Sequence, residues 1–267
     1  MFDSHLHFEF LNDQDLMNMS MAGITDIVGA TYYPHCGGIK IGSGTIKDLF
    51  HRLFTFETAR AAANRINLHL VLGINMVSVP EDYEVLLKEL PSIVQGNPQV
   101  VAIGEIGFEP SSETLPDIAA QENLFRKQVE IAAQVGLPIV CHTPNPRCQK
   151  LQYTQRLLDI IGEMGFDFEN VIIDHACEET VELIHSKGAW AAVSIQPSRN
   201  TSEIDAADIA MKYGVEKLLI NSDFSNKLSD ALAVPKTAFY LRRKGMSEEK
   251  ICKLFTENPK KIYRLDT

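Results

Sequence analysis

The chain alternates short apolar runs with longer segments in which apolar residues recur at helical spacing. The apolar runs predict strands at residues 2–8, 26–31, 68–75, 100–105, 138–142, 171–175, 189–195 and 218–223. Between most of them the spacing predicts helices, at residues 47–66, 81–94, 121–135, 149–164, 178–186 and 202–213, and a last helical region covers residues 229–255. Strands that alternate with helices in this way are typical of a parallel sheet.

Eight strand–helix units favour an α/β fold of the (β/α)8 TIM barrel type over an open doubly wound sheet, which is the alternative. A length of 267 residues suits one barrel, and no Pro-, Gly- or Ser-rich linker divides the chain. We therefore expect a single domain over residues 1–267. The irregular stretches 33–44 and 108–117 would lie at the mouth of the barrel, and the first contains His35, which is either an ordinary loop residue or a substrate contact.

Six polar residues lie on or at the ends of the predicted strands: His5, His7, Glu105, His142, His175 and Asp223. His5 and His7 are two residues apart on the first strand, so both side chains point to the same side, into a barrel. The other four close apolar runs at the carboxyl ends of strands, where barrel enzymes form their active sites. Packing alone does not explain four apolar strands that each end in His, Glu or Asp.

Four imidazoles and two carboxylates suit one or two divalent metal ions. Zinc fits these donors best, and manganese, magnesium and cobalt are compatible with them. A bound ion lowers the pKa of its water to roughly 7, and a pair of ions needs a bridging anion. Glu105 can bridge, whereas imidazole normally cannot. Asp223 is the candidate catalytic acid/base, because its carboxylate can take a proton from the bound water.

Three neighbours of these residues carry separate expectations. Asp3 shares the side of His5 and either holds a ligand histidine by a hydrogen bond or satisfies other polar groups of the barrel. Asp174 precedes His175 and is expected to face away from the site. Cys141 precedes His142 and is expected to be a buried thiol on the opposite side of its strand.

Composition limits the partners and the compartment. With 25 basic and 35 acidic residues the net charge is −10, which works against non-specific binding to nucleic acid or to an anionic membrane. The five cysteines include no CxxC pair, and the N-terminus lacks a basic and then apolar leader. We expect free thiols, a cytoplasmic location, a small-molecule substrate and no membrane partner.

Three motifs together resemble the TatD family of metal-dependent hydrolases in the amidohydrolase superfamily. They read DSHLH at residues 3–7, GEIGFE at 104–109 and LPIVCH at 137–142. The likeness runs through most of the chain, and ENP at residues 257–259 resembles the closing motif of the superfamily. The resemblance implies a role for each candidate: one metal on His5 and His7, a second metal on His142 and His175, Glu105 as the bridge, and Asp223 as a ligand of the first metal and as acid/base.

Other motifs depart from the family and bear on the substrate. TPNPR at residues 143–147 replaces a short basic segment, DHA stands at 174–176 and NSDF at 221–224. By analogy we expect hydrolysis of a phosphoester by a metal-activated water. The runner-up is hydrolysis of a carboxylic ester, lactone or amide, and an alternative of another class is a metal-holding binding protein without catalysis. Nuclease activity is disfavoured by the acidic charge and by the weak phosphate-binding features.

Overall fold

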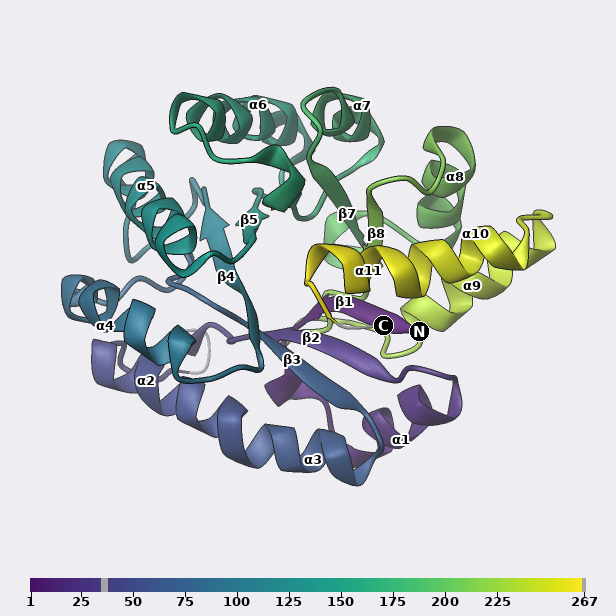
Figure 1. Ribbon diagram of the computed structural model, residues 1–267, viewed down its shortest axis with the longest axis horizontal. Helices are drawn as coiled ribbons and strands as arrows, with labels where there is room; N and C mark the ends of the chain where they lie inside the picture. The colour runs from purple at the N-terminus through teal and green to yellow at the C-terminus, as the bar shows by residue number, and fades with distance from the viewer. Residues whose placement is uncertain (35–37, 266–267) are drawn as a thin grey trace.

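The strands form a parallel barrel with helices around it (Figure 1). The structure is a computed structural model that describes residues 1–34 and 38–265, so His35 lies outside the described residues. The strands follow one another around the sheet in chain order: β1 (Phe2–Leu6), β2 (Asp26–Ala30), β3 (Asn67–Leu72), β4 (Val100–Gly107), β5 (Ile139–His142), β6 (Val171–Ile173), β7 (Trp190–Ser194) and β8 (Leu218–Asn221). This confirms the predicted (β/α)8 TIM barrel.

Helices follow the strands and form the outer layer seen in Figure 1. They are α1 (Asp13–Met21), α2 (Ser43–Arg52), α3 (Thr58–Ala63), α4 (Tyr83–Gln95), α5 (Ile118–Val135), α6 (Arg147–Glu163), α7 (Glu178–Ser186), α8 (Glu203–Tyr213), α9 (Ala233–Arg243), α10 (Glu248–Cys252) and α11 (Asn258–Ile262). Short 3-10 turns occur at η1 (Phe8–Phe10), η4 (Phe168–Asn170) and η5 (Pro197–Arg199), and π-helical turns at η3 (Leu53–Glu57) and η6 (Lys253–Glu257). Among the described helices, none combines the length and the hydrophobicity of a membrane-spanning segment.

Two helical regions differ from the prediction. The sequence pattern predicted no helix before β2, yet α1 forms there and begins with a capping box between Asn12 and Asp15. Only Leu16 and Met19 of α1 are buried, too few to produce a periodic pattern. The last helical region breaks between α9 and α10, where Gly245 has a φ of +85° that ordinary side chains rarely adopt.

The barrel is nearly closed between β1 and β8, at what we call the seam. The hydroxyl of Ser4 donates to the carbonyl oxygen of Ile220 at 2.8 Å. Further along, the amide of Asp223 donates to His5 O at 3.1 Å, and the amide of His7 donates to Phe224 O at 2.8 Å. These bonds join the first strand to the last at the end of the barrel where the candidate residues lie.

Apolar side chains fill the barrel below the strand ends. Alternation along the strands sends one set inward, namely Val28, Val71, Ala102, Val140, Ile172, Ala192 and Leu219, and all are buried in one cluster. The opposite set packs against the helices in the larger outer core. The C-terminal Tyr263 joins the inner cluster and donates its hydroxyl to Ser4 O at 3.1 Å. The polar residues therefore lie above a layer of buried apolar side chains, which we call the apolar floor.

Candidate active site

The structure brings the six predicted residues together at the carboxyl ends of the strands, and all are buried. His5 lies within β1 and His7 directly follows it, while Glu105 lies near the end of β4. His142 is the last residue of β5. His175 and Asp223 lie two residues beyond β6 and β8.

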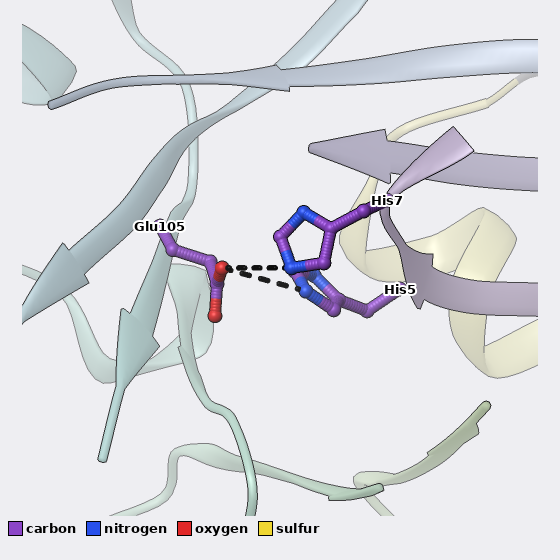
Figure 2. A group of neighbouring side chains, drawn as sticks. All are labelled: His5, His7 and Glu105. Atoms are coloured by element: carbon purple, nitrogen blue, oxygen red, sulfur yellow. Dashed lines mark ion pairs between the residues drawn. The ribbon is translucent and has the colours of Figure 1, made fainter. Parts of the chain in front are cut away.

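One carboxylate oxygen of Glu105 faces the first histidine pair. Its Oε2 lies 3.6 Å from His5 Nε2 and 3.8 Å from His7 Nε2. Figure 2 shows both imidazoles pointing at the glutamate from the opposite side of the barrel. The ligand atoms of these three residues lie close enough together to hold a metal ion.

The other oxygen of Glu105 faces the second histidine pair. Its Oε1 lies 3.2 Å from His142 Nδ1 and 3.1 Å from His175 Nε2, and these two nitrogens are 3.1 Å apart. This trio is a second group that could hold a metal ion. The two oxygens of one carboxylate thus serve two separate histidine pairs, which is the arrangement that a bridging carboxylate requires.

The first group also fits a divalent cation by its unsatisfied atoms. Both ring nitrogens of His5 are buried and make no hydrogen bond to any described residue, which is rare for buried polar atoms. In His7, Nδ1 lies 3.0 Å from Thr31 O, and in His175, Nδ1 lies 2.8 Å from Ser194 Oγ. Such contacts fix the ring orientation and leave Nε2 directed at the centre, as in metal-binding histidines.

The position of Asp174 corrects an expectation, because its carboxylate points into the site rather than away from it. Oδ1 accepts from Asn221 Nδ2 at 3.0 Å and from Ser194 Oγ at 3.2 Å, while Oδ2 lies 3.4 Å from His5 Nδ1. The strand β6 ends at Ile173, and His175 has a left-handed φ of +57°. Strand alternation therefore no longer applies to these residues, and both side chains reach the interior.

Asp223 also has a left-handed backbone, with a φ of +45°. Such conformations are costly for residues other than glycine and concentrate at functional sites. The turn brings Asp223 Oδ1 to 4.0 Å from His7 Nε2. Asp3 does not reach this centre: its Oδ1 accepts from the Ser222 amide at 3.0 Å, so it supports the turn that presents Asp223.

Sequence reasoning missed several residues that contact the centre from loops. The Tyr33 hydroxyl and the Asn75 amide donate to Glu105 Oε2 at 2.9 and 3.2 Å. Glu109 Oε2 lies 3.3 Å from His142 Nε2. Each follows a strand end within a few residues, which was the available signal, but loop positions have no periodicity that assigns a direction.

Arg199 is the most consequential residue that was missed. Its guanidinium group is bound to the Asp223 carboxylate through Nε and to Asn145 Oδ1 through Nη1, and Nη2 lies 2.9 Å from His175 Nε2. It comes from η5, the turn after β7. A single buried cation therefore contacts the lone pairs of two candidate metal ligands.

Charges in the centre favour anionic carboxylates. Burial alone would raise the pKa of Glu105, but His5, His142 and His175 hold that pKa well below its usual range. Burial would likewise raise the pKa of Asp223, and Arg199 more than offsets this, so that its pKa is also lowered. Burial and the nearby Arg199 lower the pKa of His175 to about 4. Both carboxylates are therefore anionic and His175 is neutral, whereas Glu105 and Glu109 raise the pKa of His142 to about 9, so that His142 must release a proton to bind a cation.

A cavity of about 350 Å³ opens over the centre. Its lining includes His142 and Arg199, and also Tyr33, Asn145 and Lys227. Its volume is in the range of small-molecule sites.

A family model described as "TatD related DNase" matches residues 2–264. The chain belongs to the TatD family. A metal-dependent hydrolase of Methanocaldococcus jannaschii, named as uncharacterized, is 31% identical over 99% of this TatD chain and 100% of the relative. A solved TatD-like protein from Archaeoglobus fulgidus is 28% identical, with a TM-score of 0.79 over 99% and 100% of the two chains.

A TatD homolog from Escherichia coli shares 17% identity and a TM-score of 0.71 over 100% of this chain and 98% of its own, which shows the fold alone. With the family model and the relatives, this TatD chain is a metal-dependent hydrolase. Its candidate metal-binding cluster consists of histidines and a glutamate.

Proposed function

We propose that this TatD-family hydrolase cleaves a small phosphoester with a water activated by two divalent ions. The observation that carries the proposal is the placement of Glu105, whose Oε2 faces His5 and His7 while Oε1 faces His142 and His175. Zinc fits these donors best, and manganese, magnesium and cobalt are compatible. When bound, such ions lower the pKa of water to about 7 and polarise the phosphoryl oxygen.

Different residues would hold the two ions and fix the carboxylate between them. His5 and His7 would hold one ion and His142 and His175 the other, with Glu105 bridging. Tyr33 and Asn75 keep the bridging carboxylate in place by their bonds to Oε2. The buried apolar floor beneath the site excludes bulk water and strengthens these electrostatic interactions.

Asp223 would move the proton. Water attack forms one P–O bond and breaks the bond to the leaving alcohol, so one proton must pass from the water to the leaving oxygen. Asp223 would accept it from the water and deliver it to the leaving oxygen, since its carboxylate is anionic and lies beside His7. Arg199 weakens this base in the present arrangement, and the pair must loosen before the proton can transfer.

A substrate panel with matched variants tests the proposal. Metal-loaded protein is offered phosphodiesters, phosphomonoesters, lactones, amides and single-stranded DNA. We expect turnover of small phosphoesters that is lost in Asp223→Asn and kept in Asp159→Asn, an exposed carboxylate on α6. Turnover confined to lactones or amides would overturn the phosphoester assignment, and turnover of DNA alone would make the enzyme a nuclease.

A further inference from the structure

A second cavity of about 370 Å³ lies beside the candidate centre. Cationic side chains from α6, η5 and α8 line it, namely Arg147, Lys150, Arg199 and Lys212. Arg199 lines both this cavity and the one over the centre, so its side chain forms part of the wall between them.

Lys150 is the residue in this cavity that lacks a counter-charge. It is 3% exposed, and its Nζ donates to the backbone oxygen of His175 at 2.8 Å. None of the described carboxylates lies within ion-pair distance of it. Buried lysines are almost always paired, because removing an ammonium group from water carries a large desolvation penalty. The described carboxylates therefore leave the charge of Lys150 uncompensated.

The acidic residues of the same cavity do not supply that anion. Glu178 pairs with Lys212 at 2.7 Å, and Asp208 pairs with Lys244 at 2.7 Å. Asp205 accepts from Ser202 at the start of α8, at 2.6 Å from its hydroxyl. Each carboxylate already has its own partner, so the charge of Lys150 remains available to a ligand.

Lys150 is also hydrogen-bonded to a residue of the candidate metal centre. The carbonyl to which it donates belongs to His175, whose Nε2 faces Glu105. An ester bound over His142 and His175 would have to extend only past Arg199 to reach the second cavity. The volumes of both cavities suit parts of one small molecule.

We infer that the cavity lined by Lys150, Arg147 and Lys212 binds an anionic group of the substrate, a phosphate or a carboxylate, which is separate from the ester that is cleaved. The assignment of this anionic group to the substrate rests on the proposed function, whereas the binding of an anion in the cavity does not depend on it. It narrows the substrate class to small esters that carry a second anionic group. Arg147 and Lys212 pair with Glu179 and Glu178, but both are half-exposed or more, so each can leave its partner and turn toward such a group.

The binding test uses metal-free protein and two probes, inorganic phosphate and malonate. Titration calorimetry compares the wild type with Lys150→Gln, which keeps a hydrogen-bond donor for His175 O and removes the charge. Lys127→Gln is the matched control, because this lysine pairs with Glu84 away from both cavities. We expect one probe or both to bind the wild type and the control, and Lys150→Gln to bind at least about tenfold more weakly, as expected for a lost charge-assisted bond.

Lys150→Met is a second variant, because methionine has a similar length and removes the buried charge without introducing an amide. It tests whether the weaker binding expected for Lys150→Gln comes from the lost charge or from the glutamine amide. The preferred probe tells phosphate from carboxylate. Equal affinity in wild type, Lys150→Gln and Lys150→Met would overturn the inference, as would the absence of binding of both probes to the wild type.

A kinetic comparison separates this inference from the proposed function. In metal-loaded enzyme, Lys150→Gln should lower kcat/KM for a phosphoester with a second anionic group about tenfold more than for one without it. Anion binding that depends on Lys150 in a protein inert toward phosphoesters would sink the proposed function alone. Phosphoester turnover with no such difference between substrates would sink the inference alone.

Discussion

The guanidinium group of Arg199 lies 2.9 Å from Nε2 of His175, the nitrogen that also lies 3.1 Å from Oε1 of Glu105. The same guanidinium binds the carboxylate of Asp223. A lone pair that contacts Arg199 in this way cannot also bind a metal ion. The internal cation and a second ion bound by His175 would therefore compete for one position.

This competition predicts that Arg199→Gln binds the second ion more tightly. Releasing a charge-assisted contact worth about 1.5–3 kcal/mol corresponds to a gain in affinity of roughly 10- to 100-fold. Titration of zinc or manganese into metal-free protein measures the gain. Arg126→Gln, at a surface pair with Glu122 and Glu163, is the control. Unchanged affinity in Arg199→Gln would show that the guanidinium does not occupy the metal position.

Glu105→Gln is expected to remove the bridge between the two ions. The amide oxygen carries no charge, so the two cations would repel each other without compensation. Elemental analysis should find about two ions in the wild type and at most one in the variant, and hydrolysis should fall by more than about 100-fold. Glu89→Gln, at an exposed pair with Lys47, should retain both ions. Full occupancy in Glu105→Gln would contradict the bridging role.

Gly104→Ala is expected to disturb the site through the backbone. A Cβ atom at Gly104 would lie 2.7 Å from Val140 O and 2.8 Å from Val140 Cβ, closer than real contacts allow. β4 must then move away from β5, with a loss of about 1–3 kcal/mol in the free energy of unfolding. Metal content should fall with it, because Glu105 moves too.

Gly44→Ala is the control for that substitution, since nothing lies within 4 Å of its added Cβ. Urea unfolding of the two variants measures the difference. Equal free energies of unfolding for Gly104→Ala and the wild type would show that a Cβ atom at Gly104 fits between β4 and β5 without displacing them.

A pair remote from the centre predicts a pH-dependent contribution to stability. Asp26 Oδ1 lies 2.9 Å from His69 Nε2 and accepts from Asn67 Nδ2 at 3.1 Å. Burial would raise the pKa of Asp26, but these bonds more than offset it and the pKa lies below its ordinary value of 3.8. A lowered pKa stabilises the folded state above pH 3.8, and this stabilisation is lost as the pH falls through the folded value.

Asp26→Asn lacks this contribution, so the free energy of unfolding of the wild type should exceed that of the variant above about pH 5, by less than about 1 kcal/mol for a partly exposed pair. The difference should shrink below pH 3.8. Urea unfolding from pH 3 to pH 7 measures it in both proteins. A difference that does not change with pH would contradict the assignment to the Asp26 carboxylate.

Residues held by regular strands could be placed from the sequence, and those held by irregular turns could not. Glu105 and His142 lie on strands, where alternation and position at the carboxyl end assign their direction. Asp174 was misplaced, because the left-handed turn at His175 follows from packing around the site and leaves no periodic trace. Arg199 was missed because its approach to Asp223 depends on the path of the loop after β7.

A metal ion held by residues at the seam between β1 and β8 would link ion binding to the stability of the whole barrel. The amide of Asp223 donates to His5 O, so residues near opposite ends of the chain share both a backbone bond and a candidate ion. An ion that binds only the closed barrel stabilises closure by its own binding free energy. Removal of the ion by a chelator should then speed hydrogen exchange at the His7 and Asp223 amides ahead of the rest of the barrel, as local opening of the first and last strands precedes global unfolding.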